Sequence, residues 1–354
     1  MSAADVRPED AFDVMKVAAW LRGHVAPEIA ADLEGEPVVR QFSGGASNLT
    51  YELVWPARAL VLRRPPHGAL GGSAHNMPRE HDLQAALAPV FDRVPRMVAL
   101  CTDETVIGAE FYVMERLEGV VLGRDVPDGV ELGPDDARGL CETAWDTLVE
   151  LHDVAVADVP ALAALDRGDG FVHRQVAGWT KRFRAARTPD VPDFEDIMAW
   201  VAEHEPPDRP HTLIHNDFRL DNLVLDHGDP TRVVGVLDWE LATVGDPLID
   251  LGGALAYWVQ ADDEETMQQL RLQPTNRPGM LTRAEIVERY CAARSVEVTP
   301  EEWTFYEVFG LFRLAGIAQQ IYHRYHHGHT TNPRFATFGP MVTYLDHRCR
   351  TLIG

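Results

Sequence analysis

Short apolar runs separated by turn residues fill the first third of the chain, a pattern typical of β-structure. Each run mixes β-branched or aromatic side chains with polar ones. Turn signals rich in Gly, Asn and Pro lie between the first three runs. We therefore predict strands at residues 38–43 (VVRQFS), 50–55 (TYELVW), 59–63 (ALVLR), 105–108 (TVIG) and 111–116 (FYVMER).

A helix is predicted after the third of these strands. Asn76 is a residue type that caps helix N-termini, and Pro78 fits the first helical turn, where its missing N–H is not needed. Glu80, Leu83 and Leu87 follow at spacings that place them on one helix face. Because two of the three are leucines, we expect this face to point toward the sheet and to carry Glu80 with it.

The chain becomes mainly helical beyond Gly119. Its 354 residues, 45% of them hydrophobic, are enough to bury a sizeable core. We predict an α+β fold with two lobes. The first is a small β-rich lobe at residues 1–117, and the second is a larger, mainly helical lobe at residues 118–354. Residues 115–119 would form the short connector between them.

One strongly non-helical segment, residues 211–250, interrupts the second lobe. It contains two apolar β-type runs, 222–226 (NLVLD) and 233–238 (VVGVLD), which a Gly-Asp-Pro turn signal separates. This pattern predicts a β-hairpin. If the hairpin folds about the proline of that turn, Asn222 at the start of the first run lies opposite Asp238 at the end of the second.

Three oxygen-bearing side chains converge at the open end of this hairpin. Asp217, in the sequence His215-Asn216-Asp217, precedes Asn222 by five residues. Mg²⁺ prefers a few oxygen ligands and keeps its other positions for water and phosphate oxygens, which Asn222 and Asp238 would allow. Asp217 would then be available to orient a substrate hydroxyl and to accept its proton as the oxygen attacks phosphorus.

The charge balance restricts the partners of the protein. With 32 basic and 55 acidic residues the formal net charge is −23, a field that repels nucleic-acid phosphates and anionic lipid surfaces. We expect neither nucleic acid nor a membrane as a partner. An anionic substrate such as a nucleoside triphosphate would need local arginines or a divalent cation to reverse this field at its site.

Cysteine usage and the N-terminal sequence predict a cytoplasmic protein. The four cysteines lie far apart, without the spacing of a zinc site or a disulfide framework, and we interpret them as reduced core thiols. The first residues, MSAADVRPEDAFDV, lack the basic start and the apolar run of a signal peptide. No run of 18 uncharged apolar residues occurs in the sequence.

The motif H-x-D-x-x-x-x-N, followed by an apolar hairpin and L-D-W-E, resembles the catalytic and metal-binding loops of the aminoglycoside phosphotransferase and choline kinase-like families. These families have two-lobed, protein-kinase-like folds. Other segments match in order: FSGGASNLTYEL is similar to the nucleotide-covering loop, LVLRRPP to the third strand, REHDLQAAL to the facing helix and FYVMERLEG to the inter-lobe hinge. The string VLRRPP, with SAH and RE after it, is most similar to the phosphotransferase subfamily associated with acyl-CoA dehydrogenases.

The resemblance assigns roles to individual positions. Asp217 matches the catalytic base, and Asn222 and Asp238 match the metal ligands. Arg63 matches the basic residue that holds the ATP phosphates, and Glu80 matches the helix glutamate that pairs with it. The commoner residue at the Arg63 position is Lys, whereas Arg is a larger fork that grips phosphate oxygens bidentately.

The resemblance also implies a nucleotide site with ATP and Mg²⁺ bound between the lobes and the adenine against the hinge. A Gly-containing turn, which here replaces the usual GxGxxG, would cover the phosphates with its backbone N–H groups. The expected residues of this turn are Ser43, Gly44, Gly45, Ser47 and Asn48. The expected hinge residues are Met114, Glu115 and Leu117.

Three residues near the catalytic motif need separate interpretation. His215 is expected to hold the loop backbone by hydrogen bonds rather than to bind a ligand. Asp250, in GDPLIDLG, resembles the aspartate that braces the catalytic loop in the family, but it is equally suited to cap the helix that follows. Glu240 could reach the metal, directly or through water, or could remain a solvated loop charge.

The C-terminal region holds candidates for substrate binding. Residues 322–329 (YHRYHHGH) invite a transition-metal hypothesis, but His323 and His327, four residues apart at a helix end, are more typical of surface or cleft residues. With Arg313 and Arg324 the segment is locally basic, which suits an anionic acceptor such as a carboxylate or CoA ester better than a polycationic aminoglycoside. Because Arg313 has apolar neighbours, we expect it to be paired or to face a cleft.

Together these features predict an ATP- and Mg²⁺-dependent kinase that transfers the γ-phosphate of ATP to a hydroxyl of a small molecule. The subfamily resemblance suggests a hydroxyacyl acceptor, whereas the wider families suggest choline, homoserine, a sugar or an aminoglycoside. Two other functions are alternatives. A pseudokinase would bind Mg·ATP without turnover and regulate a partner, and a metal-dependent phosphohydrolase would release phosphate from its substrates without ATP.

Overall fold

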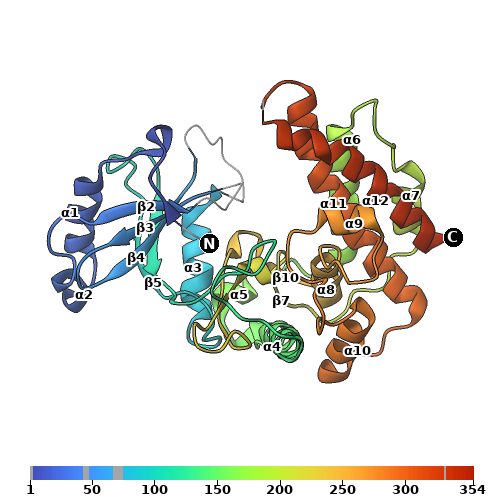
Figure 1. Cartoon of the computed structure of the whole chain (residues 1–354), viewed down its shortest axis with the longest axis horizontal. Coiled ribbons are helices and arrows are strands. Elements are labelled where there is room, and N and C mark those ends of the chain that lie inside the picture. Colours follow the sequence, from blue (N-terminus) through green and yellow to red (C-terminus); the bar gives the residue numbers. More distant parts are fainter. Residues whose placement is uncertain (1–2, 43–47, 67–74, 331) are drawn as a thin grey trace. The chain divides into compact units, whose positions relative to one another are not determined.

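The computed structural model describes residues 3–42, 48–66, 75–330 and 332–354 (Figure 1). The chain forms two compact units. The first unit consists of Met1–Gly123, Ala157–Leu162 and Asp221–Leu241. The second unit consists of Arg124–Val156, Ala163–Leu220 and Ala242–Gly354. The hairpin segment, which the sequence suggested as part of the second lobe, thus belongs to the first unit.

An antiparallel sheet of six strands, counted over the described residues, forms the core of the first unit (Figure 1). Its strand order is β1-β2-β3-β4-β6-β5. The bounds are Ala3–Ala4 (β1), Val38–Phe42 (β2), Leu49–Val54 (β3), Ala59–Arg64 (β4), Met97–Cys101 (β5) and Phe111–Glu115 (β6). The strands predicted at 38–43, 50–55, 59–63 and 111–116 are therefore confirmed to within one residue at each end.

The strand predicted at 105–108 is wrong, because this stretch forms a turn. The Oδ1 atom of Asp103 accepts hydrogen bonds from the backbone N–H and the hydroxyl of Thr105, at 2.9 and 2.7 Å. Gly108 ends the turn at φ +80°, a conformation that favours glycine. The strand β5 forms instead from the apolar run before the turn, and it pairs with β6.

Residues of β4 alternate between the two faces of the sheet. Leu60 and Leu62 join the larger apolar core, which includes residues of α1 (Val14–His24). Val61 joins a smaller cluster with Met77, the first residue of α3 (Met77–Leu87). Arg63, two residues after Val61, therefore lies on the face that α3 covers.

The helix α3 confirms the prediction made from its capping residue. The Asn76 side chain accepts a hydrogen bond from the backbone N–H of Arg79 at 2.9 Å. Leu83 and Leu87 are buried, and Glu80 is only 3% exposed. The predicted face thus points inward and buries a carboxylate against the sheet.

The strands β8 (Leu223–Leu225) and β9 (Val233–Val236) form the predicted hairpin, but the predicted register is wrong. Leu223 pairs with Val236. Beyond the strands, the N–H of Leu237 donates to the carbonyl of Asn222 at 2.8 Å. Asn222 therefore lies opposite Leu237, and Asp238 is one residue further on.

Local turn chemistry accounts for this difference in register. The N–H of Asp226 donates to the carbonyl of Arg232 at 2.9 Å, so the loop closes one residue before the proline. The Asp226 side chain stabilises this closure by accepting from the N–H groups of Gly228 and Asp229. An irregularity between Val224 and Leu225 then shifts the pairing again.

Helices make up most of the second unit (Figure 1). They are α4 (Pro134–His152), α6 (Phe171–Ala186), α7 (Glu195–Glu203), α8 (Pro247–Leu255), α9 (Glu265–Leu270), α10 (Arg283–Arg294), α11 (Pro300–His326) and α12 (Phe338–Ile353). The short helices of the chain are α2 (Pro27–Ala31), α5 (Pro160–Ala163), η1 (Pro8–Asp10), η3 (Val156–Asp158), η4 (Leu220–Asn222), η5 (Trp239–Leu241) and η6 (Pro333–Thr337). Two short strands, β7 (Thr212–Ile214) and β10 (Thr243–Gly245), pair antiparallel within this unit.

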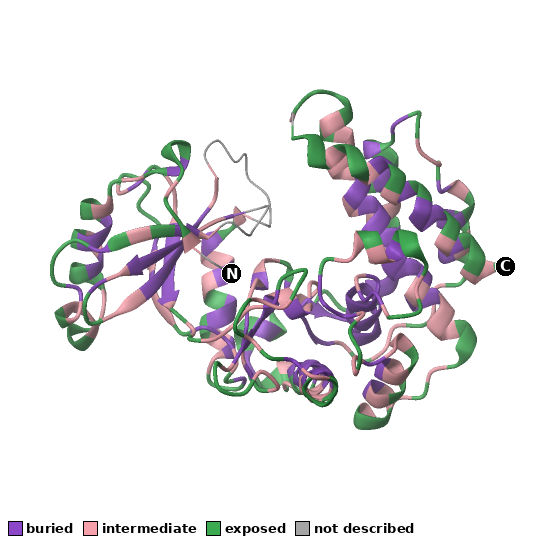
Figure 2. Ribbon diagram, viewed as in Figure 1, coloured by how far each residue is buried: buried purple, intermediate pink, exposed green. Residues whose placement is uncertain are grey.

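The helix α8 is buried along its whole length, as its colour in Figure 2 shows. The long helix α11 packs against α6, α8 and α12. Asp250 of α8 and Arg313 of α11 hydrogen-bond to the loop after β7. Among the described helices, none combines the length and the apolar character needed to cross a membrane.

The cysteines are free thiols, as expected. Cys101, Cys141 and Cys349 are buried, whereas Cys291 is partly exposed, so the prediction of core thiols holds for the first three. Burial raises the pKa of the Cys141 thiol to about 12. Because the thiolate is the reactive form, this residue is chemically inert.

Candidate active site

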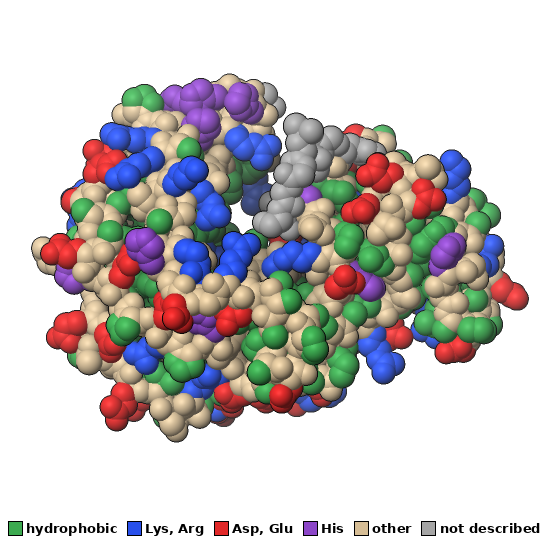
Figure 3. Space-filling view, turned by 180° about the vertical axis from the view of Figure 1, so that it is seen from behind, with side chains coloured by type: hydrophobic (Ala, Val, Ile, Leu, Met, Phe, Trp, Pro, Cys, Tyr) green, Lys and Arg blue, Asp and Glu red, His purple; other side chains and the backbone are tan. Residues whose placement is uncertain are grey.

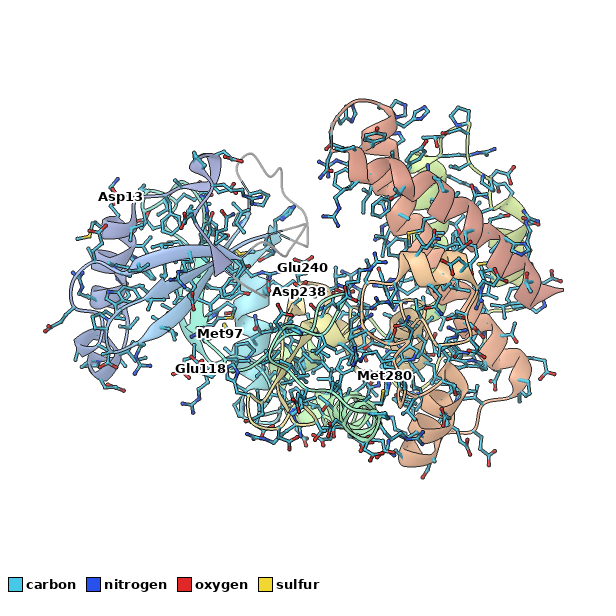
Figure 4. All side chains as sticks on the ribbon, in the orientation of Figure 1. Asp13, Met97, Glu118, Asp238, Glu240 and Met280 are labelled. Carbon is cyan, nitrogen blue, oxygen red and sulfur yellow. The ribbon has the colours of Figure 1, made fainter. Side chains whose placement is uncertain are left out.

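An arginine held by three carboxylates forms the charged centre of the first unit. Arg63 lies on β4, and its Nη2 donates to Asp238 Oδ1 at 2.6 Å and to Glu240 Oε2 at 2.8 Å. Its Nε lies 3.3 Å from Oε1 of Glu80 on α3. The expected ion pair of Arg63 with Glu80 is therefore present, and two carboxylates from the segment after β9 join it. Figure 4 shows these two, Asp238 and Glu240, side by side near α3.

Burial and charge act on this arginine in opposite directions. Burial alone would lower the pKa of Arg63, but the neighbouring charges, with Glu80 foremost, raise it well above its ordinary value. Burial raises the pKa of the Glu80 carboxyl, although the positive charge of Arg63 and a hydrogen bond from Tyr112 oppose this shift. The guanidinium therefore stays charged in a buried position because carboxylates surround it.

Tyr112 supports Glu80 from the sheet, a role that the sequence interpretation missed. It lies on β6 directly opposite Arg63. Its hydroxyl donates to Glu80 Oε1 at 2.8 Å and accepts from the side-chain amide of Gln84 at 3.4 Å. Its spacing of two residues from Met114 was the available signal, because alternate residues of a strand share one face.

Glu240 is an ion-paired and largely enclosed member of this cluster, so its interpretation as a solvated loop charge is wrong. Its side chain is 10% exposed. Besides Arg63, its Oε2 accepts from Nδ2 of Asn48 at 3.0 Å, and its carbonyl accepts from Nη1 of Arg79 at 3.1 Å. Asn48 is the described member of the predicted phosphate turn. The other predicted members, Ser43, Gly44, Gly45 and Ser47, lie outside the described residues.

The predicted metal ligands, Asn222 and Asp238, lie at the open end of the hairpin. Asn222 is the last residue of η4 and is 5% exposed. Asp238 follows β9 with a left-handed backbone (φ 68°), and its side chain is 26% exposed. In the described part of the chain, no group of three or more His, Cys, Asp or Glu side chains is arranged to hold a metal ion. A metal that uses one carboxylate, one amide oxygen and substrate phosphates does not need such a group.

Of the predicted hinge residues, Met114 and Glu115 end β6, which pairs with the strand of Arg63, and Leu117 follows it. Met114 is 8% exposed and packs with Val61 and Tyr112, and Glu115 ends the strand. Leu117 packs on Gly235 of β9, where an added Cβ would lie 2.2 Å from the Leu117 Cδ1 atom. Their contact with an adenine stays a prediction.

The loop after β7 is braced by Asp250 of α8. The two carboxylate oxygens of Asp250 accept hydrogen bonds from the backbone N–H groups of His215 and Asn216, both at 2.7 Å. The cap of α8 is a different residue, Asp246, whose side chain accepts from the N–H of Leu248 at 2.8 Å. Of the two interpretations of Asp250, the brace is therefore confirmed and the cap is wrong.

His215 and Asn216 set the backbone in front of Asp217. The His215 side chain is fully buried, and its Nδ1 accepts from the N–H of Asp217 at 3.3 Å, which is the backbone-holding role expected for it. Asn216 has φ 65°, a left-handed conformation that Asn tolerates better than most residues. The chain turns at this point and leaves the Asp217 side chain 20% exposed.

A buried network extends this brace into the helices, and the sequence offered no signal for it. The Nε2 of His152, at the end of α4, lies 3.1 Å from Asp250 Oδ2, and its Nδ1 lies 2.6 Å from the hydroxyl of Tyr290 on α10. Burial lowers the pKa of His152, which keeps the imidazole neutral. Burial alone would raise the pKa of Asp250, but hydrogen bonds from His152 and the loop lower it. A neutral His152 can therefore donate from Nε2 to the Asp250 carboxylate and accept from Tyr290.

Two arginines flank Asp217. Arg219 lies with Nε 3.3 Å from Asp217 Oδ1, and its guanidinium is 4.8 Å from the ring centre of Tyr257. Arg313 on α11 donates from Nη2 to the carbonyl of Asn216 at 2.5 Å. The sequence interpretation had named Arg313 but missed Arg219, although it stands two residues after Asp217 in the motif itself.

The other C-terminal candidates are His323 and Arg324. In the described part of the second unit, no hydrogen bond, ion pair or ring contact joins either of them to the loop that carries Asp217. The ring of His323 lies 4.2 Å from that of His327, and histidine side chains gather at this end of the unit (Figure 3). Burial and the neighbouring histidines lower the pKa of His323. A substrate role for His323 or Arg324 stays a prediction.

Comparison with known proteins identifies the family of this chain. The sequence pattern of the phosphotransferase enzyme family matches residues 38–286, more than half of the chain. Acyl-CoA dehydrogenase family member 11 of Homo sapiens is 33% identical over 343 residues, which cover 97% of this chain and 43% of that protein. The protein of the same name from Gallus gallus is 34% identical over 349 residues, covering 98% and 44%. This chain thus spans less than half the length of these relatives.

Solved structures share the fold. A Ralstonia eutropha protein, described as a candidate aminoglycoside phosphotransferase, is 28% identical with a TM-score of 0.78 over 97% of this chain and 98% of its own. The choline kinase of Cryptosporidium parvum has a TM-score of 0.63 at 10% identity, over 96% of each chain, and therefore shows the fold alone. The two-unit architecture is the protein-kinase-like fold that the motifs predicted. The chain belongs to the phosphotransferase enzyme family.

Proposed function

We propose that the protein transfers the γ-phosphate of ATP to a hydroxyl group of a small acyl-type molecule, with Mg²⁺ as the metal. The observation that carries the proposal is the buried Arg63 with its carboxylates. In kinases, a basic residue on this strand, paired with a glutamate of the facing helix, holds the nucleotide phosphates. Membership in the phosphotransferase enzyme family supports the same chemistry.

The proposed phosphate contact uses a part of Arg63 that its protein partners leave open. Nη2 and Nε face carboxylates, whereas no described residue accepts a hydrogen bond from Nη1. A guanidinium presents five N–H donors in a planar fork, which matches the geometry of phosphate oxygens. Glu80 and Tyr112 would keep this fork oriented while it binds.

The charge of the same cluster suits a divalent cation. Three carboxylates surround one guanidinium, so the cluster has an excess of negative charge. We propose Asn222 and Asp238 as the ligands, because carboxylate and amide oxygens are what Mg²⁺ prefers. When bound, Mg²⁺ would neutralise charge on the phosphate oxygens. Glu240 would support this site by holding the same Nη2 of Arg63 that Asp238 contacts.

Asp217 is proposed as the residue that positions the acceptor. Its carboxylate would accept the hydroxyl proton while the hydroxyl oxygen bonds to the γ-phosphorus and the bond from that phosphorus to the ADP oxygen breaks. The products are ADP, a phosphate ester and one proton, which Asp217 then releases to water. Its partial exposure leaves the carboxylate reachable, and the Asp250 brace holds the loop in front of it.

A hydroxyacyl compound is the acceptor that the relatives suggest. The proteins that match nearly all of this chain are named as acyl-CoA dehydrogenase family members, and more than half of each lies outside the match. A kinase segment joined to an enzyme of acyl-CoA chemistry would act on an acyl compound of the same kind. Acceptor specificity transfers less readily than fold, so this part of the proposal rests on experiment.

The test is an ADP-release assay with Mg·ATP across four acceptor classes. These are hydroxyacyl-CoAs with their free hydroxy acids, choline and ethanolamine, homoserine and sugars, and aminoglycosides. Asp217→Asn and Asp238→Ala are the inactive variants, and Asp158→Asn, on the exposed surface of η3, is the matched control. Binding of Mg·ATP is measured in parallel by calorimetry.

The expected result is ADP formation that depends on a hydroxyacyl acceptor and is lost in both variants but not in the control. Mg·ATP binding without turnover on any acceptor would favour a regulatory pseudokinase. Phosphate release from phosphorylated compounds in the absence of ATP would favour a phosphohydrolase. Absence of both nucleotide binding and turnover would contradict the proposed function.

A further inference from the structure

We propose that Arg313 binds an anionic group, a carboxylate or a phosphate, on the acceptor molecule, so that the acceptor is a hydroxylated anion rather than an amine cation. This inference rests on the proposed function, because it names the class of acceptor that reaches Asp217. It also names the side chain that would recognise the acceptor, which the fold of the family does not specify.

The first observation is a buried charge that the chain itself does not compensate. Arg313 is 7% exposed and lies in α11 between Phe312 and Leu314, both buried. Among the described residues, its guanidinium donates one hydrogen bond, to the carbonyl of Asn216, and its central carbon lies 5.6 Å from the centre of the Trp179 ring. Within the described residues, no carboxylate lies at ion-pair distance from it. Buried charges are normally paired, so this arginine is missing an anion.

The second observation is space that is kept for the guanidinium. On α8, an added Cβ at Gly253 would lie 2.6 Å from Nη1 of Arg313. A glycine at this position therefore lets the head group lie against the helix, while Trp179 of α6 supports it from another element. Three helices thus position a side chain whose hydrogen-bond acceptor, among the described residues, is a neutral carbonyl. A neutral donor would satisfy that carbonyl without burying a charge.

The third observation is the position of this charge next to the proposed base. The carbonyl that Arg313 holds belongs to Asn216, the residue directly before Asp217. On the other side, Arg219 contacts the Asp217 carboxylate itself. A molecule that presents its hydroxyl to Asp217 would therefore have two guanidinium groups close to the atoms next to that hydroxyl. An anionic substituent would be attracted there, and a quaternary ammonium or amino sugar would be repelled.

The anionic group could come from two sources with the same chemistry. One is the carboxylate of a free hydroxy acid, and the other is a phosphate of a larger carrier, such as the CoA part of a hydroxyacyl thioester. A guanidinium recognises both through parallel N–H donors. The two sources differ in a way that an experiment can use, because forming the thioester removes the carboxylate and adds phosphates.

The experiment compares wild type with Arg313→Gln and with the matched control Arg182→Gln. Arg182 lies against the same Trp179 ring, 4.7 Å from its centre, but is exposed. The probes are 3- and 4-hydroxybutyrate, their methyl esters, their CoA thioesters, and choline. KM and kcat are measured from ADP release, direct binding of each probe and of Mg·ATP is measured by calorimetry, and thermal unfolding checks that each variant is folded. Arg313→Lys, which keeps the charge, is the second variant.

We expect Arg313→Gln to raise KM for the anionic probes by about 10- to 100-fold, the loss typical of a hydrogen bond to a charged group, with kcat little changed. Arg313→Lys should retain part of the affinity, and Arg182→Gln should behave as wild type. A loss confined to the free acids identifies the carboxylate, and a loss confined to the thioesters identifies the phosphate.

Other outcomes separate this inference from the proposed function. If Arg313→Gln lowers turnover of the methyl esters as much as that of the acids, Arg313 only positions the loop and the inference fails while the kinase function stands. Preference of the wild type for choline, or absence of binding of every anionic probe, would overturn it in the same way. Binding of an anion that depends on Arg313, without ADP formation on any probe, would support the inference and count against the proposed function.

Discussion

The two units place the same charged residue types in opposite arrangements. In the first unit, one guanidinium, that of Arg63, is surrounded by three carboxylates. In the second unit, one carboxylate, that of Asp217, has Arg219 at its oxygen and Arg313 at the carbonyl directly before it. The first cluster has an excess of negative charge. In the second, two guanidinium groups lie beside the partly exposed Asp217 carboxylate, whereas the buried Asp250 carboxylate is engaged by the loop N–H groups and His152.

The local charge of each cluster, rather than the net charge of −23, therefore determines the sign of the ligand that the cluster attracts. A cluster with surplus carboxylates attracts a cation, and a loop with surplus guanidinium groups attracts an anion. The burial of both clusters strengthens these preferences, because charges interact more strongly away from water. A cluster that bound cations and anions equally well would contradict this conclusion.

The largest effect is expected from Asp217→Asn, which removes the carboxylate proposed as the base. An amide cannot accept the hydroxyl proton, so kcat should fall by about 100- to 10 000-fold. Binding of Mg·ATP should stay unchanged, since the arginine proposed to hold the phosphates and the proposed metal ligands lie in the first unit. Single-turnover kinetics and calorimetry measure the two quantities separately. A variant that keeps more than a tenth of the wild-type kcat, a tenth being about 1.4 kcal/mol, would show that Asp217 is not the base.

A smaller effect is expected within the first cluster, where two carboxylates share the Nη2 of Arg63. The Asp238 side chain is 26% exposed and that of Glu240 is 10% exposed, so Asp238 is the one that a cation can reach. We expect Asp238→Asn to raise the Mg²⁺ concentration for half-maximal activity by at least about 100-fold, and Glu240→Gln by about 10-fold or less. Equal effects of the two matched variants would contradict this assignment.

The elements that the sequence predicted are those whose signals are local. Alternation of apolar residues defined four strands of the sheet, and the cap at Asn76 with its leucine face defined α3. The errors arose where side chains close turns. The carboxylate of Asp103 folds the apolar stretch at 105–108 into a turn, and that of Asp226 closes the hairpin one residue early. Such bonds compete with strand pairing, and hydrophobic periodicity does not record them.

The candidate site divides in the same way. The motif around Asp217 and the pairing of Arg63 with Glu80 were predictable, because both follow from residue order and helix face. The role of His152 was not, because it depends on which helices pack together, and Tyr112 was recognisable only as a residue that shares a strand face with Met114. The sequence around Asp250 could not distinguish a helix cap from a brace of the loop. Both roles require a carboxylate that accepts hydrogen bonds from backbone N–H groups.

Tyr112→Phe tests what holds Glu80 in position in the first cluster. The change removes the hydroxyl that donates to the buried Glu80 carboxylate but keeps the ring. Hydrogen bonds to charged groups contribute about 1.5–3 kcal/mol, so the free energy of unfolding measured in urea should fall by that amount. Tyr325→Phe is the control, because the Tyr325 ring stacks on Tyr322 and its hydroxyl bonds to no described residue. A loss below about 0.5 kcal/mol, the size of an ordinary surface substitution, would show that Glu80 does not depend on Tyr112.

The smallest effect is expected from His152, which belongs to the network that braces the loop before Asp217. It is an effect on the pH dependence of the unfolding free energy. Burial lowers the pKa of His152 below its ordinary value near about 6.5, so in the folded protein the ring stays neutral as the pH falls through that value. In the unfolded chain the same ring takes up a proton. Acidification below pH 6.5 should therefore favour unfolding by up to about 1.4 kcal/mol per pH unit for this one group, until the lowered folded pKa is reached.

His152→Gln isolates this contribution from that of the other histidines. Glutamine can still donate to Asp250, but it does not titrate, so the difference in unfolding free energy between wild type and variant should narrow as the pH falls from 7 toward 5. Above pH 7 the difference should be constant, because His152 is then neutral in both states. A difference that does not change between pH 7 and 5 would mean that the folded protein protonates His152 as readily as the unfolded chain does. Asp250 would then be held by a charged imidazole, and the loop would carry a third positive charge beside Arg219 and Arg313.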